Sequence, residues 1–237
     1  MNPSLSPHIV AWLEWASHHR EYCPSGAAPM VITLGAYLTI VSALAVERLY
    51  ELFLSARNTR HAFAIGAVEA GRKHYLPMVA FHALFLGAAA AEAIVLRRPF
   101  PGLLGWAALG GTLGAQALRY WCIATLGPRW NTRIIVWPGL APVSRGPYRF
   151  TRHPNYFAII VEIACVPLIR GCWLTAIIFS AGNAMLLVQR IRAEEAAMGP
   201  LYAREFADRM RFIPLPGRRR LDGRLEPRQS TRRGSRA

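Results

Sequence analysis

The polar residues that could do chemistry gather in two short segments of an otherwise apolar chain. The first is residues 145–156, which read RGPYRFTRHPNY and lie directly before an apolar segment. Pro154 suits the first turn of a helix, because a proline there loses no hydrogen bond. That helix start would offer backbone N–H groups and a positive dipole end to an anionic ligand. Basic residues can merely flank a membrane helix, but the histidine, tyrosines and prolines around a tight turn favour a binding site.

The second segment places Arg190 four residues before Glu194, with Glu195 next to it. Residues four apart share one face of a helix, so the arginine and the first glutamate should lie together. Such a pair at the end of the last span could belong to a functional site. An ordinary surface ion pair would show the same spacing, so this segment alone does not decide between the two interpretations.

Glu162 falls inside the apolar segment that follows Asn155. A carboxyl group at membrane depth is costly and therefore raises a functional hypothesis, here substrate ordering or proton removal. A structural partnership with Arg119 or Asn183 is an equally good interpretation. His74 and His82 are interpreted as packing or interfacial residues. Metal-ligand spacing is absent from the four cysteines, so neither a metal site nor a disulfide framework is predicted for Cys23, Cys122, Cys165 and Cys172.

The composition points to a membrane for the elements that must position these residues. The 237-residue chain is 53% hydrophobic and only 17% charged, whereas charged residues make up about a quarter of a soluble domain. The net charge is +15. Because the basic residues lie in loops and in the C-terminal tail, they mark the cytoplasmic side of a membrane protein and predict no nucleic-acid binding.

The apolar blocks predict an all-α integral membrane protein with about five transmembrane helices, of which the one at 155–169 is shorter than the ~20 residues that a bilayer requires. The expected spans are residues 29–54, 75–96, 101–126, 155–169 and 173–189. The last two should form a tight helical hairpin. Four glycines on the third span offer a surface for close helix packing: Gly105, Gly110, Gly111 and Gly114.

The chain divides into three predicted parts. Residues 1–28 form an N-terminal interfacial segment, residues 29–213 the membrane domain, with its catalytic part at about 127–213, and residues 214–237 a basic disordered tail. After Gln189 the pattern becomes amphipathic and is broken at Gly199-Pro200, which predicts two short helices near the surface. The basic loops 55–74 and 127–154 then place the active site and the C-terminus in the cytoplasm and the N-terminus outside.

The order of these motifs resembles one family. The pattern Gly146-x-Tyr148-x-x-x-Arg152-His153-Pro154-x-Tyr156 is followed by a hairpin, by Arg190-x-x-x-Glu194-Glu195 and by Phe212-Ile213-Pro214. Over about residues 127–216 it is similar to the isoprenylcysteine carboxyl methyltransferase family. The resemblance implies a small membrane bundle that holds S-adenosylmethionine at its cytoplasmic face under a C-terminal lid.

The resemblance also implies roles for individual residues. Arg190 would face the anionic group of the substrate, and Glu194 would contact the cofactor. His153 is the candidate base if the acceptor is a phenol, and Glu162 is kept as a third candidate catalytic residue. The eukaryotic enzymes often carry a histidine at the position of Leu140. The remaining cofactor contacts would come from Leu140, Ala141, Pro142, Val143, Tyr148, His153, Pro154, Asn155 and Tyr156.

Two further runs narrow the resemblance. Residues 130–139, WNTRIIVWPG, and residues 66–75, GAVEAGRKHY, look like a bacterial branch similar to methyltransferases that work beside type III polyketide synthases. That branch implies methyl ethers of long-chain alkylpyrones or alkylresorcinols. The expected partners are therefore a lipid-like substrate and membrane lipids, with no metal.

Three alternatives remain from the residues alone. Sterol-type membrane reductases that use NADPH can end in a similar Arg-His-Pro-x-Tyr element. A phospholipid N-methyltransferase would share the architecture, although Arg190 is a poor neighbour for a cationic acceptor. A membrane scaffold without catalytic activity would leave both polar segments unexplained.

Overall fold

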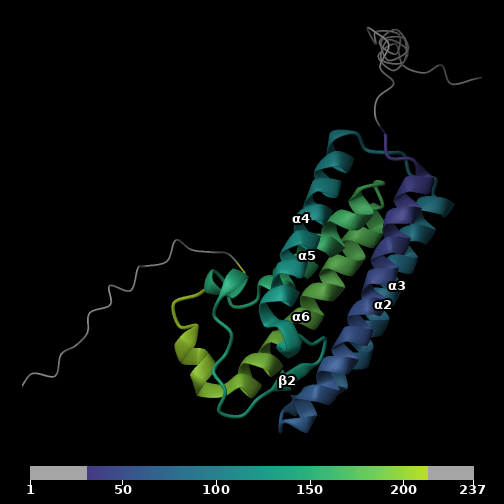
Figure 1. The fold of residues 1–237 in the computed structure, drawn as a ribbon. Helices are drawn as coiled ribbons and strands as arrows, with labels where there is room; N and C mark the ends of the chain where they lie inside the picture. The colour runs from purple at the N-terminus through teal and green to yellow at the C-terminus, as the bar shows by residue number, and fades with distance from the viewer. Residues whose placement is uncertain (1–30, 213–237) are drawn as a thin grey trace, which may run out of the picture. The chain divides into compact units, whose positions relative to one another are not determined.

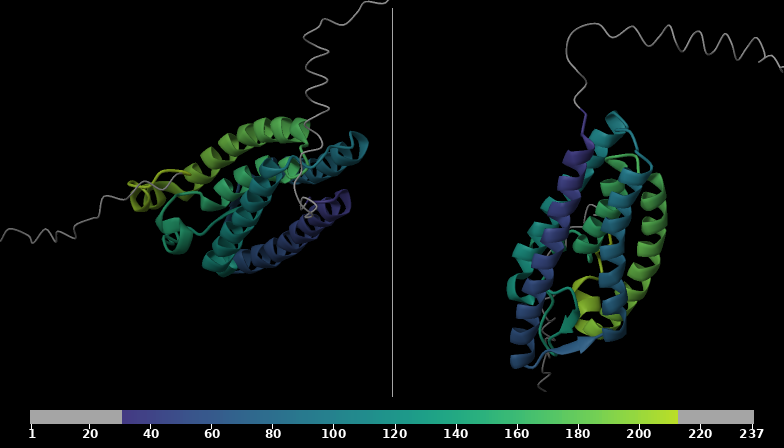
Figure 2. Two further views of the ribbon diagram at one scale, coloured as in Figure 1. Left: turned by 90° about the horizontal axis from the view of Figure 1, so that it is seen from above. Right: turned by 90° about the vertical axis from the view of Figure 1, so that its right-hand side faces the viewer.

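Five long helices make up most of residues 31–212, the part of the chain that the computed structural model describes. Figure 1 and Figure 2 show them packed side by side with their axes roughly aligned. The predicted interfacial segment 1–28 and tail 214–237 lie outside the described residues. In chain order the helices are α2 (Leu34–Ala64), α3 (Tyr75–Val95), α4 (Leu103–Leu126), α5 (Pro154–Leu168) and α6 (Trp173–Glu205).

The short elements lie at one end of the bundle, where they connect the helices (Figure 2). Strands β1 (Val68–Ala70) and β2 (Ile134–Val136) pair antiparallel, with Val68 opposite Val136. The purely α-helical prediction therefore missed a small sheet. Three 3-10 turns complete this end: η1 (Arg72–His74), η2 (Gly127–Arg129) and η3 (Gly146–Arg149).

Helix α2 does not end at Leu54, as predicted, but continues to Ala64. The prediction was wrong because three polar residues after Leu54, namely Ser55, Asn58 and Thr59, are buried on a continued helix instead of forming a loop. Ser55 Oγ donates to Asn131 Oδ1 at 2.7 Å, and Asn58 Nδ2 donates to the Trp130 carbonyl at 2.8 Å. These bonds satisfy buried polar groups and fix the loop before β2 on α2.

The predicted hairpin is confirmed in α5 and α6, which are joined at Gly171 in a left-handed backbone conformation (φ 63°). Helix α6 does not break at Gln189, however. It continues to a kink at Gly199 (φ 69°, ψ −161°), directly before Pro200. The predicted interruption is therefore present, and the expected first short helix is the continuation of α6.

Among the helices of residues 31–212, α3 and α6 are long and apolar enough to cross a membrane. Helix α2 carries Glu47, Arg48 and Glu51 in its middle and does not qualify. Large apolar side chains nevertheless face outward, including Leu103, which is 85% exposed, and this surface suits contact with lipid. The count of five spans and their orientation stay predictions.

The predicted glycine surface of α4 is used at two of its four positions. A Cβ on Gly111 would lie 2.7 Å from Cys165 Sγ, and one on Gly105 would lie 3.0 Å from the Ile169 carbonyl oxygen. The same atom on Gly110 or Gly114 would meet nothing within 4 Å. Helix α5 thus approaches α4 closely along one stripe only.

This difference predicts opposite effects of two neighbouring substitutions. Gly110→Ala should stabilise the protein by about 0.5–1 kcal/mol, because alanine has the higher helix propensity. Gly111→Ala should lose that gain and destabilise by about 1–2 kcal/mol, because the added methyl group overpacks the α4–α5 contact. Thermal unfolding in detergent would compare them, and equal midpoints would contradict the packing.

Candidate active site

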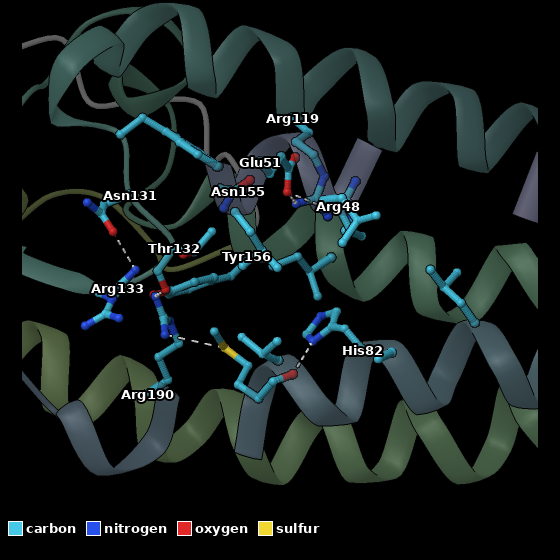
Figure 3. Close-up of a pocket in the computed structure, with 18 of the residues that line it drawn as sticks. Arg48, Glu51, His82, Arg119, Asn131, Thr132, Arg133, Asn155, Tyr156 and Arg190 are labelled. Atoms are coloured by element: carbon cyan, nitrogen blue, oxygen red, sulfur yellow. Dashed lines mark hydrogen bonds and ion pairs between the residues drawn. The ribbon is translucent and has the colours of Figure 1, made fainter. Parts of the chain in front are cut away.

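The cavity shown in Figure 3 lies between the helices and has a volume of about 610 Å³. Its walls come from α2, α3, the loop before β2, the start of α5 and the middle of α6. Apolar residues such as Val41, Leu52, Leu86 and Ile159 form much of the lining. Its polar residues cluster toward the end of the bundle where the short elements lie.

A second cavity of about 460 Å³ adjoins the first. It lies among β1, β2, residues 137–143 and the end of α6. The two cavities share part of their lining, so a ligand in one can meet a ligand in the other. The shared residues are Leu126, Asn131, Arg133, Tyr148, Arg152 and Glu194.

Arg190 lies in the wall of the first cavity with only 7% of its surface exposed. Its guanidinium donates from Nε to the Tyr156 hydroxyl at 2.7 Å and from an Nη atom to the Thr132 carbonyl at 2.6 Å. A third contact, at 3.4 Å, reaches the sulfur of Met78. Within residues 31–212 no carboxylate forms an ion pair with this guanidinium, so its charge remains available to a ligand. The sequence patterns did not identify the contributions of Thr132 and Met78.

Tyr156 connects Arg190 with Glu194. Its hydroxyl accepts from the guanidinium and donates to a carboxylate oxygen of Glu194. The predicted shared face of Arg190 and Glu194 is therefore present, but the two side chains meet through a third residue. This arrangement places a positive group in the first cavity and a negative group where the cavities join.

His153 is buried and stacks on the Tyr156 ring at a centroid distance of 5.2 Å. Its Nε2 lies 3.1 Å from a carboxylate oxygen of Glu195, which is also paired with Arg211. Because a carboxylate can only accept, Nε2 carries the hydrogen and the neutral ring keeps Nδ1 as its acceptor. Glu195 thus sets the tautomer of a histidine that lines the first cavity.

The other predicted cofactor residues lie around the second cavity and at its junction with the first. Burial raises the pKa of Tyr148 well above its ordinary value, so its hydroxyl stays protonated. Asn155 lines the first cavity, and its buried side-chain oxygen has no hydrogen-bond partner in the described part of the chain. Pro154 forms the predicted first turn of α5. Of the loop residues, Leu140, Pro142 and Val143 line the second cavity, while the Ala141 carbonyl accepts from Arg129 at 2.9 Å.

Glu162 lies outside the lining of both cavities. Its carboxylate accepts from Arg119 at 2.8 Å and lies 3.6 Å from Arg48. The structural partnership with Arg119 is therefore present, whereas the proposed partnership with Asn183 is not formed. A direct catalytic role for Glu162 stays a prediction, and the geometry favours the structural interpretation.

Comparison with known proteins identifies the family. Residues 107–200, which include most of α4, all of α5 and α6 as far as Pro200, match the model of the isoprenylcysteine carboxyl methyltransferase family. The uncharacterized protein YpbQ of Bacillus subtilis is 38% identical over 160 residues, which cover 67% of this chain and 94% of that protein. The chain belongs to the isoprenylcysteine carboxyl methyltransferase family.

An uncharacterized protein of Haemophilus influenzae is also similar, at 29% identity over 168 residues that cover 70% of this chain and 95% of that protein. Family membership makes this chain a membrane methyltransferase of the isoprenylcysteine type. The matched region contains Arg190, Tyr156, Glu194 and His153, so the family assignment falls on the residues that surround the two cavities.

The hydroxyl bridge predicts a specific effect of Tyr156→Phe. Removal of the hydroxyl leaves a buried guanidinium and a carboxylate each without one partner, at a cost of about 1.5–3 kcal/mol. The affinity of the protein for S-adenosylmethionine, which the resemblance assigns to Tyr156 and Glu194, should fall by about tenfold or more. Tyr50→Phe, on the exposed face of α2, is the matched control and should have no effect. Equal affinities in calorimetric titrations of the two variants would contradict the bridge.

Proposed function

We propose that the chain uses S-adenosylmethionine to methylate an oxygen of a lipid-like substrate at the junction of the two cavities. The observation that carries the proposal is the buried guanidinium of Arg190, which lines an apolar cavity without a carboxylate partner in the described chain. A buried charge is costly unless it is compensated, so an anionic ligand group is the natural partner. A carboxylate or an acidic enol on a long apolar molecule has that chemistry.

The division into two cavities supports separate places for substrate and cofactor. The apolar walls of the first cavity suit an alkyl chain that enters from the bilayer. The second cavity would take S-adenosylmethionine at its junction with the first, where the Glu194 carboxylate offers an acceptor to a cationic, polar ligand. The Tyr148 hydroxyl, which burial keeps protonated, offers a donor there.

When bound, S-adenosylmethionine supplies a methyl group attached to a sulfonium. Arg190 would hold the acceptor oxygen in its ionised form, and the apolar walls would keep water away from it. A carboxylate or enolate needs no base. A phenol must first lose a proton, and His153 Nδ1 is the acceptor that Glu195 leaves free.

The narrower substrate proposal is a long-chain alkylpyrone or alkylresorcinol. It rests on the resemblance of residues 66–75 and 130–139 to a polyketide-associated branch, and those two runs meet in the structure. Arg133 pairs with Glu69 at 3.1 Å and lies over the Tyr75 ring at 4.5 Å. Arg133 lines both cavities, and Thr132 of the same run accepts a hydrogen bond from Arg190, whereas residues 68–70 of the other run line the second cavity.

An amine acceptor fits this site less well, because Arg190 would repel a cationic head group. A reductase that uses NADPH remains the alternative to be tested by cofactor binding. The basic loops place this end of the bundle on the cytoplasmic side by the positive-inside rule, and that orientation is part of the proposal.

Cofactor binding to the detergent-purified protein tests the proposal first. S-adenosylmethionine should bind saturably to the wild type, and Glu194→Ala should lose at least tenfold in affinity because it removes the charged acceptor. Glu205→Ala is the matched control, since this residue lies on the same helix with a more exposed carboxylate. Binding of NADPH in place of S-adenosylmethionine would turn the assignment toward a reductase.

Arg190→Gln should separate cofactor from substrate. Its affinity for S-adenosylmethionine should stay within a few-fold of wild type, while kcat/KM for methylation falls about a hundredfold, since a charge-assisted contact of about 3 kcal/mol is lost. Transfer of a labelled methyl group to alkylpyrones, alkylresorcinols and prenylcysteines would measure this. A variant with full activity would show that Arg190 does not hold the acceptor.

A further inference from the structure

We propose that the first cavity contains a second polar site, distinct from Arg190, that binds a neutral hydroxyl group of the lipid-like substrate. The site consists of His82 on α3 and of Arg48 and Glu51 on α2. Figure 3 shows Arg48 and Glu51 on one side of the cavity and His82 across from them. The inference deepens the proposed function, because it assumes that this cavity takes the substrate.

His82 presents a free acceptor. Its Nδ1 lies 2.8 Å from the Met78 carbonyl oxygen, which cannot donate, so the ring hydrogen is on Nδ1. The Nε2 of the neutral ring is then an acceptor, and within residues 31–212 it has no hydrogen-bond partner. The sequence pattern led us to interpret His82 as a packing or interfacial residue, whereas the structure places it in the cavity wall.

The opposite wall holds a buried ionic cluster that is incompletely satisfied. Arg48 donates to Glu51 Oε2 at 2.8 Å, and Arg119 lies 3.5 Å from the same oxygen. Within residues 31–212 the other oxygen, Glu51 Oε1, is buried without a hydrogen-bond partner, and so are the Nε atoms of Arg48 and Arg119. The Glu51 side chain is only 5% exposed. The cluster therefore presents a polar wall to the cavity from side chains that are mostly buried.

The charges of the cluster select the kind of group that can bind. Three carboxyl groups, those of Glu47, Glu51 and Glu162, surround two guanidiniums, those of Arg48 and Arg119. The excess carboxyl group disfavours a second anion, and the Arg190 guanidinium in the same cavity disfavours a cationic amine. A neutral hydroxyl can donate to His82 and accept from an arginine of the cluster.

The second polar site lies close enough to Arg190 for one substrate ring to contact both. The sulfur of Met78 contacts Arg190 at 3.4 Å, while its carbonyl holds His82, one helical turn or about 6 Å farther along α3. A ring with two oxygens could therefore place an ionised oxygen at Arg190 and a neutral hydroxyl at His82. The second site would fix the ring orientation and thereby select the oxygen that is methylated.

Two matched ligands test the second site by binding alone: a 5-alkylresorcinol and a 3-alkylphenol with the same alkyl chain, titrated into the detergent-purified protein. The wild type should bind the dihydroxy ligand about three- to tenfold more tightly, as one added hydrogen bond would give. His82→Phe should abolish this preference, and His82→Gln, which keeps an acceptor, should retain most of it.

Leu84→Phe is the control, because it adds the same side chain to the exposed face of α3. Its preference should equal that of the wild type, and thermal unfolding of all variants in detergent checks that they fold. Equal binding of the two ligands by the wild type, or loss of affinity for both by His82→Phe, would overturn the second site. Methylation is scored separately, so a protein that shows the binding preference but transfers no methyl group contradicts only the proposed function.

Discussion

A positive charge without a carboxylate partner is the constraint on which the site depends. The Arg190 guanidinium is buried among helices, where an uncompensated charge is expensive. Neutral acceptors hold it instead: the Tyr156 hydroxyl from α5, the Thr132 carbonyl from the loop before β2, and the Met78 sulfur from α3. Four elements must converge to supply and hold this one group, so its position is fixed by the fold before any ligand binds.

The guanidinium of Arg119 is also buried, but its charge is compensated in a different way. The guanidinium pairs directly with Glu162 and lies near Glu51, so most of its charge is compensated within the bundle. Replacement of one member of such a buried pair is costly because it leaves the other charge buried without a partner. This difference explains why Arg190 is assigned a role in ligand binding and Arg119 a structural role. In the sequence alone the two residues look alike, because each lies in an apolar segment.

Features that depend on local chemistry could be predicted from the sequence. Pro154 marked the start of α5, and Gly199-Pro200 marked the kink in α6, because each acts through its own backbone. The continuation of α2 beyond Leu54 could not be predicted in this way. The partners that bury Ser55 and Asn58 lie 72–76 residues farther along the chain, and no local pattern reveals that loop. The place of His82 in the cavity wall could not be predicted for the same reason, since it depends on how α2 packs against α3.

The kink at Gly199 gives the Arg-His pair of the first motif a physical explanation. Beyond the kink, the chain returns to the start of α5, where Arg152 Nε donates to the Arg209 carbonyl at 2.6 Å and the His153 N–H donates to the Arg211 carbonyl at 3.0 Å. The Glu195 carboxylate that orients the His153 ring also hydrogen-bonds to Arg211 and raises the pKa of that guanidinium. The motif therefore fixes residues 207–211 at the start of α5, and Arg211 of that segment shares the Glu195 carboxylate with the His153 ring. Because these contacts are mutual, the histidine tautomer and the position of this segment depend on each other, and neither could be inferred from one motif alone.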